Sequence, residues 1–147
     1  MAGETPSQTV GPFLAIGLPW TDGPVADPAG VTIGGLVLDG AGQPVPDALV
    51  ETWHADPPAF ARAATDDDGA WSVRVPAVPF VSLHVFARGL LRHVTTRAYL
   101  GALPDGDPVL TLVPAERRET LLAERSGDGY RFDIRIQGDG ETVFFDV

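Results

Sequence analysis

The chain contains no cysteine and no lysine. The lack of cysteine excludes disulfides, thiolate nucleophiles and Cys-based zinc sites, and nothing demands an oxidising compartment. The lack of lysine removes the residue that a phosphate-binding loop needs, which disfavours nucleotide binding. No apolar run approaches the roughly 20 residues of a membrane span, and the N-terminal MAGET lacks the basic and apolar regions of a signal peptide. These absences predict a cytoplasmic protein that does not enter a membrane.

Basic residues are scarce as well, because acidic residues outnumber them 20 to 10 and the formal net charge is −10. A nucleic-acid surface needs clustered cations to neutralise phosphates. The charge balance therefore predicts that the chain binds no nucleic acid.

Glycine and proline are abundant instead, with 17 and 14 residues among 147, and hydrophobic residues make up 44% of the chain. This length and hydrophobic content suit one folded domain with a single core. So many glycines and prolines are typical of short strands joined by turns, and they are too many for a helical bundle. The composition predicts an all-β domain.

Strand-like segments follow one another from residue 31 onward, separated by turn signals such as DGAG at 39–42 and DDDG at 66–69. A possible helical turn near residues 108–112 interrupts the pattern. We predict strands over residues 31–38, 48–54, 70–75, 80–86, 92–100, 120–125, 130–137 and 142–147.

About seven or eight short strands at this spacing predict an antiparallel β-sandwich over residues 31–147. Residues 1–30 contain many turn formers and little periodicity. We predict that they form an extended N-terminal arm rather than part of the core.

Few residues suggest independent chemistry. The three histidines, His54, His84 and His93, form no His-x-His or His-x-x-x-His pair that would place two imidazoles side by side. Their spacing alone leaves a site of two histidines and one carboxylate open, but we prefer to interpret them as packed or surface histidines. Ser72 and Ser82 lie inside predicted strands without the Gly-x-Ser-x-Gly frame of a nucleophile. The acidic turn at 66–69 lacks the later glutamate of a calcium loop and is ordinary between strands.

Four segments carry a resemblance to a known family. They are the arm segment TPSQTVGPF at 5–13, ETWHAD at 51–56, FARG at 86–89, and the tail from RRETLL at 117–122 through YRFDIRIQG at 130–138 to ETVFFD at 141–146. With these motifs, of which the tail is the most specific, the chain resembles the α-type subunits of intradiol ring-cleavage dioxygenases. The resemblance spans almost the whole chain, and it implies a β-sandwich.

The resemblance also implies that this chain carries no metal. Catalytic members hold a ferric ion with two tyrosines and two histidines, and the histidines form a His-x-His pair on the strand that corresponds to residues 80–86. In this chain the pair reads Phe80 and Ser82. The tyrosines would fall in the loops 57–64 and 76–79, which are short and contain none. The expected Fe(3+) therefore belongs to a β-type catalytic partner subunit.

By the same resemblance, the chain works in a hetero-oligomer that converts protocatechuate and O2 to 3-carboxy-cis,cis-muconate. Its arm would cover the partner's iron site, with Thr9, Gly11, Pro12 and Phe13 as wall residues and Arg88 as the cationic group. Glycine allows the backbone to approach a flat substrate, proline stiffens the turn, and arginine can pair with a carboxylate.

Several alternatives remain beside this interpretation. Phe13 stands where the family has a tyrosine, and it can equally serve ordinary interface packing, while Arg88 can instead form an ion pair between the sheets. The segments 35–48 and 65–75 also resemble prealbumin-like accessory domains, which favours a stand-alone binding module without activity. Those domains need neither the arm nor the tail, so we prefer the dioxygenase subunit. The loops after Asp56 and Pro76 are shorter than in the α-type subunits.

Overall fold

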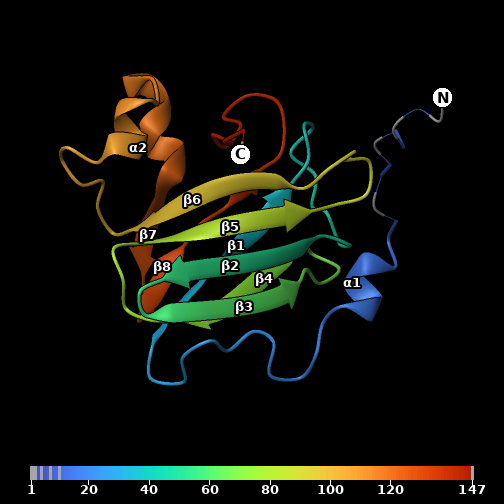
Figure 1. Cartoon of the computed structure of the whole chain (residues 1–147), viewed down its shortest axis with the longest axis horizontal. Coiled ribbons are helices and arrows are strands. Elements are labelled where there is room, and N and C mark those ends of the chain that lie inside the picture. The colour runs from blue at the N-terminus through green and yellow to red at the C-terminus, as the bar shows by residue number, and fades with distance from the viewer. Residues whose placement is uncertain (1–2, 4, 7, 10, 147) are drawn as a thin grey trace.

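The computed structural model describes residues 3, 5–6, 8–9 and 11–146, and it places the chain in two packed layers of strands (Figure 1). Residues 1, 2, 4, 7, 10 and 147, which fall in the predicted arm and the last predicted strand, lie outside the described part. The strands are β1 (Val31–Leu38), β2 (Leu49–Ala55), β3 (Pro58–Ala64), β4 (Ala70–Val75), β5 (Phe80–Phe86), β6 (Val94–Leu100), β7 (Leu122–Ser126), β8 (Gly129–Arg131) and β9 (Ile134–Arg135).

The strands form one continuous order, β3-β2-β5-β6-β7-β8-β1-β4, with β9 paired to β1. This sheet folds over on itself, so that β3, β2, β5 and β6 make a front layer and β8, β1 and β4 make a back layer behind it (Figure 1). The predicted all-β sandwich is confirmed. The pairings β6–β7, β1–β8 and β1–β9 are parallel, and the others are antiparallel. The parallel pair β6–β7 is possible because a long crossover separates the two strands.

The core lies between the two layers and follows from the alternation of apolar residues. Strand β5 buries Val81, Leu83 and Val85, and β4 buries Trp71 and Val75 from the other side. Alternate side chains of a strand point to opposite faces. The remaining β5 residues are therefore directed outward, where they are half-buried and form part of an outer face described below.

Several of the predicted boundaries are wrong. The strand predicted at 130–137 is divided into β8 and β9, and the strand predicted at 120–125 begins at Leu122, after a 3-10 helix. The loop predicted at 57–64 is the strand β3, which pairs with β2 along its whole length. Its alanines and its single proline have low strand propensity, so cross-strand pairing overrides local preference here. The predicted strand at 142–147 is reduced to a single bridge between Thr95 and Phe145 in its described part.

Helical structure is confined to short pieces. The predicted turn near 108–112 is confirmed as α2 (Pro108–Thr111), which Asp107 caps by accepting hydrogen bonds from the N–H groups of Val109 and Leu110. A 3-10 helix, η1 (Ala115–Leu121), and a short helix, α1 (Leu14–Gly17), were not predicted. No helix in the described chain is long and apolar enough to cross a membrane.

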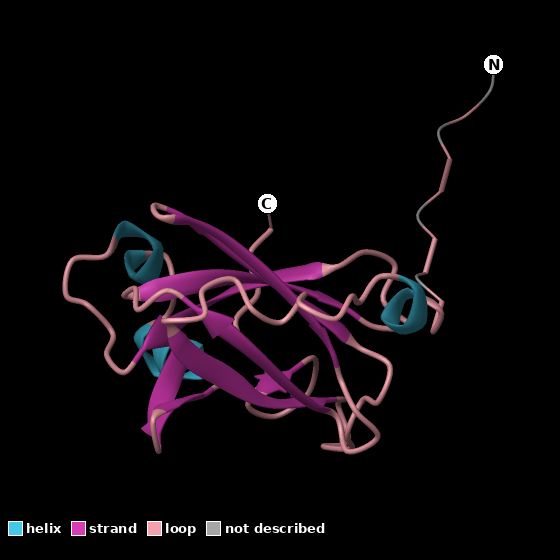
Figure 2. Ribbon diagram, turned by 90° about the horizontal axis from the view of Figure 1, so that it is seen from below, coloured by secondary structure: helices cyan, strands magenta, loops and turns pink. Residues whose placement is uncertain are grey.

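Residues 23–26 form a strap that bonds to the edge strands of both layers. The Arg62 N–H of β3 donates to the Gly23 carbonyl at 2.7 Å. On the opposite edge, the Arg74 N–H of β4 donates to the Pro24 carbonyl at 2.7 Å, and the Ala26 N–H donates to the Arg74 carbonyl at 2.8 Å. The strap therefore closes the open side of the sandwich. Figure 2 shows α1 at one end of the two layers of strands.

Close approach of the backbone at Gly35 provides a test of this fold. A Cβ atom at Gly35 would lie 2.2 Å from the Phe132 carbonyl oxygen, where β1 meets the C-terminal strands. We expect Gly35→Ala to lower the free energy of unfolding by about 1–3 kcal/mol, because the strands must separate to admit the methyl group. Gly17→Ala is the matched control, since nothing lies within 4 Å of its Cβ position. Chemical unfolding of both variants measures the effect, and equal stability of Gly35→Ala and the parent would contradict this packing.

Candidate functional site

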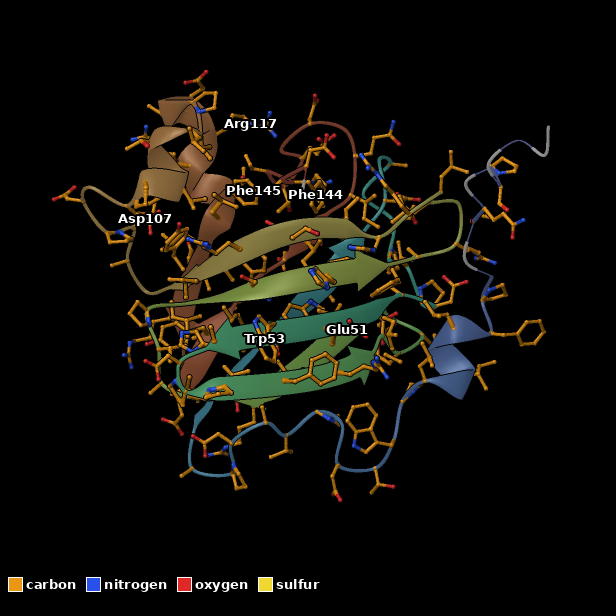
Figure 3. All side chains as sticks on the ribbon, viewed as in Figure 1. Glu51, Trp53, Asp107, Arg117, Phe144 and Phe145 are labelled. Carbon is orange, nitrogen blue, oxygen red and sulfur yellow. The ribbon has the colours of Figure 1, made fainter. Side chains whose placement is uncertain are left out.

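The outer face of the front layer carries a row of side chains set by strand register. Trp53 of β2 lies opposite Phe60 of β3 and Ser82 of β5, and Ser82 lies opposite Arg97 of β6. Trp53 is 50% exposed, and it lies with Glu51 on β2 in the front layer (Figure 3). A hollow of about 400 Å³ opens beside this row and is lined by Trp53, His54, Ala55, Asp56, Phe80, Ser82 and Arg97.

Phe80 and Ser82, the positions predicted to replace metal ligands, lie within this hollow. The Arg97 guanidinium carbon lies 4.0 Å from the centroid of the Phe80 ring, a cation–π distance. The Tyr99 ring packs against Phe80 with centroids 5.7 Å apart. A phenyl ring and an arginine offer a ferric ion no donor, so these residues do not fit the metal. No group of three or more His, Asp or Glu side chains suited to a metal ion occurs in the described part of the chain.

Arg97 also links the sheet to α2. It donates to the Tyr99 hydroxyl at 3.2 Å and lies 3.7 Å from the Asp107 carboxylate. Burial raises the pKa of Tyr99. Burial also opposes ionisation of Asp107, but hydrogen bonds from the backbone of α2 and from Tyr99, together with the charge of Arg97, hold its pKa below the usual range. The network fastens α2 beside the hollow.

A second charged cluster lies on the same face around Glu51. The Arg62 Nε donates to Glu51 Oε1 at 2.8 Å, and His84 Nδ1 lies 3.9 Å from Glu51 Oε2. The His84 ring lies 4.8 Å from the His93 ring. Burial lowers the pKa of His84 below its ordinary value of 6.5, and His93 lowers it further, whereas Glu51 raises it. The imidazole therefore favours its neutral form in the folded chain.

Arg88, the predicted cationic group, follows the end of β5 and pairs with Asp47. Its Nε lies 3.0 Å from Asp47 Oδ2, and its side chain stays 63% exposed. Asp47 Oδ1 is buried and has no hydrogen-bond partner among the described residues. The contact is an ion pair within the front layer, because Asp47 precedes β2 and Arg88 follows the neighbouring β5, and not the pair between the sheets considered from the sequence. It leaves most of the guanidinium accessible.

Among the predicted wall residues, Thr9 is held beside the loop that contains Arg88. The Gly89 N–H donates to Thr9 Oγ1 at 3.0 Å, which brings the arm to the residue after Arg88. Gly11, Pro12 and Phe13 form an exposed turn that leads into α1, where the Gly11 carbonyl accepts from the Leu14 N–H. Phe13 is 77% exposed, and no contact joins it to Arg88 within the described chain. The structure thus places Thr9 beside the Arg88 loop and leaves the other three residues on the surface.

Sequence reasoning missed Arg62 and Trp20. The ring of Trp20 stacks on Phe60 with centroids 6.3 Å apart, and the Arg62 guanidinium lies 5.2 Å from the Trp20 ring. Both Phe60 and Arg62 were assigned to a loop. The alternation of Phe60, Arg62 and Ala64 is the signal that could have placed them on one face of a strand.

Comparison with known proteins shows whole-chain similarity. The chain is 38% identical to the protocatechuate 3,4-dioxygenase alpha chain of Burkholderia cepacia over 192 residues, which cover 98% of this chain and 98% of the relative. It is 37% identical to the protocatechuate 3,4-dioxygenase alpha chain of Pseudomonas putida over 193 residues, with 97% and 96% covered. Both aligned spans exceed the 147 residues of this chain, so the relatives contain segments without a counterpart here. No family model matches.

Solved structures agree at the level of the fold. The dioxygenase domain of a dioxygenase carbohydrate-binding protein fusion from Streptomyces sp. SirexAA-E superposes with a TM-score of 0.54 at 21% identity, covering 91% of this chain and 99% of that chain. Catechol 1,2-dioxygenase from Pseudomonas arvilla C-1 superposes with a TM-score of 0.53 at 22% identity, covering 78% of this chain and 55% of that chain. Identities this low show the fold alone.

The environment of His84 predicts a pH dependence of stability. Because the pKa of His84 is lowered in the folded chain, the folded state binds fewer protons there than the unfolded state. Stability is therefore fully present above pH 6.5, the ordinary pKa, and is lost as the pH falls through the folded-state pKa. We expect His84→Gln to flatten the change in melting temperature between about pH 7 and pH 5.

His93→Gln is the matched comparison, because it removes one cause of the shift and leaves the burial of His84. It should flatten the same profile to a smaller extent. A melting profile of His84→Gln that falls as steeply as that of the parent would contradict the assignment.

Proposed function

Because the chain belongs to the family of protocatechuate 3,4-dioxygenase alpha chains, we propose that it is the non-catalytic α-type subunit of a hetero-oligomeric intradiol dioxygenase. The enzyme cleaves protocatechuate with O2 to 3-carboxy-cis,cis-muconate. A β-type subunit supplies the Fe(3+), and this chain completes the substrate pocket. The absence of cysteine is compatible with a cytoplasmic location.

One observation supports the proposal that the partner subunit, and not this chain, holds the iron. The strand that would present the His-x-His pair of catalytic relatives presents Phe80 and Ser82, and Arg97 packs over the Phe80 ring. The arrangement is a packed cation–π contact in place of a ligand set. Ring cleavage therefore falls to the partner subunit, and the residues of this chain bind and orient the substrate and exclude water.

The contribution to the pocket is assigned to the arm, residues 1–30, and to the loop after β5. Gly11 and Pro12 give a stiff turn that a flat aromatic ring can approach closely, and Phe13 offers an apolar wall. Arg88 keeps an accessible guanidinium that can pair with the substrate carboxylate. Thr9 supports this arrangement because it holds the arm beside Gly89.

Exposed apolar side chains support the need for a partner. Phe13, Ile16, Trp20 and Leu112 are all exposed, with Leu112 at 80% and Ile16 at 75%. Contiguous exposed apolar groups mark interaction surfaces, and Phe13 and Ile16 lie together at α1. The stand-alone accessory module considered from the sequence shares the first half of the strand pattern only, whereas the relatives match 98% and 97% of the chain.

The first test concerns metal content. We expect the purified chain to bind no ferric iron and to cleave no ring, because Phe80 and Ser82 offer no imidazole. Co-expression with a β-type chain should yield a complex that contains iron and is active. Metal analysis and the visible absorption spectrum measure both samples. Stoichiometric iron with visible absorbance in the isolated chain would overturn the proposed division of labour.

The second test concerns Arg88. If Arg88 pairs with the substrate carboxylate, Arg88→Ala should weaken protocatechuate binding by about 1.5–3 kcal/mol, a roughly tenfold to hundredfold rise in the apparent dissociation constant. Catechol has no carboxylate, so the variant and the parent enzyme should handle it almost equally.

Arg88 also neutralises Asp47, so the melting temperature is measured in the same samples. Asp47→Asn serves as the control, since it removes the ion pair and keeps the guanidinium. Equal losses for protocatechuate and catechol, accompanied by a lower melting temperature, would assign Arg88 to structure alone.

A further inference from the structure

Two attachments to the sandwich flank the predicted wall residues Gly11, Pro12 and Phe13. On one side the Gly89 N–H donates to Thr9, and on the other the Arg62 Nη1 donates to the Leu18 carbonyl at 3.2 Å. Between them lies α1, in which no residue is buried. Packing against the core therefore does not place this segment, and its position depends on its attachments.

All three guanidinium nitrogens of Arg62 donate hydrogen bonds at the base of the arm. Nε and Nη2 donate to one Glu51 oxygen, and Nη1 donates to Leu18. The guanidinium carbon lies 5.2 Å from the Trp20 ring and 5.4 Å from the Phe60 ring. The side chains of Arg62 and Glu51 are 20% and 13% exposed, so this charge pair is poorly screened by solvent.

Backbone hydrogen bonds also hold the segment around Trp20 against Arg62. The Gly23 N–H donates to the Trp20 carbonyl at 2.9 Å, and the Arg62 N–H donates to the Gly23 carbonyl at 2.7 Å. Gly23 is buried, and a Cβ atom there would lie 3.1 Å from the Trp20 ring. Trp20 is thus folded back over the guanidinium, between the turn and the outer face of β3.

We propose that Arg62 is the positioning residue of the arm. It fixes Leu18 and Trp20 on the front layer, and thereby sets where the turn at Gly11 to Phe13 is presented to the substrate pocket. This role rests on the proposed function for its effect on substrate, but the attachment itself is a property of this chain. Arginine suits the role because its planar fork binds a carboxylate with two nitrogens and still has a third for Leu18, which lysine cannot do.

The attachment can be measured in the chain itself, which offers no competing cysteine. Ile16→Cys places one nitroxide label on α1, at a side chain that is 75% exposed. We expect Arg62→Met to raise the mobile fraction of the nitroxide spectrum, with a roughly tenfold or larger shift in the equilibrium between attached and detached arm. Arg62→Lys should restore little of the attachment.

Arg74→Met is the matched control. Arg74 lies on the opposite edge strand, and its backbone bonds the same strap, but its exposed side chain makes no hydrogen bond or ion pair within the described residues. The spectrum of this variant should match that of the parent chain. An unchanged spectrum in Arg62→Met, or an equal change in Arg74→Met, would overturn the attachment.

In the assembled enzyme, kinetic measurements on the same variants distinguish a positioning role of Arg62 from a general loss of stability. We expect Arg62→Met to raise KM for protocatechuate roughly tenfold with a smaller change in kcat, while iron content and subunit association stay as in the parent. A mobile arm with unchanged KM would overturn the positioning role. If the parent chain forms no active complex at all, the proposed function fails, whereas the nitroxide result on the attachment still stands.

Discussion

The structure depends on how the unpaired backbone groups of the two edge strands find hydrogen-bond partners. Strands β3 and β4 end the continuous order of strands, and each would otherwise expose unpaired N–H and C=O groups. Residues 23–26 supply partners to both edges, through Arg62 on one side and Arg74 on the other. Backbone polar groups need such partners wherever water is excluded. The strap therefore completes the sandwich and also fixes the point from which the arm departs.

The position of the arm follows from this closure. The chain that leaves the strap turns back at Gly23, so that Trp20 and Leu18 meet the outer face of β3. Beyond that point α1 contributes no buried residue to the core, and its Ile16 side chain is exposed. Contacts within its own chain therefore stabilise α1 little. Its apolar surface suits burial in a partner subunit, which gives the proposed hetero-oligomer a physical reason.

The outer face of the front layer is organised by contacts among its own side chains. Arg97 lies over the Phe80 ring while it donates to the Tyr99 hydroxyl. Glu51 on the same face is neutralised by Arg62 and does not project into open space. These contacts hold the surface of the sandwich together.

The sequence by itself determined the all-β class, the strands from 31 to 38 and from 80 to 86, and the absence of imidazoles at Phe80 and Ser82. These follow from alternation and residue identity, which are local properties. Tertiary structure alone decided that residues 58–64 form a strand, because its pairing with β2 outweighs the weak strand propensity of alanine and proline. It also decided the partners of Arg62 and Arg88. Glu51, Leu18 and Asp47 are distant or unremarkable in sequence, and the folding of the sheet is what brings them within hydrogen-bond distance.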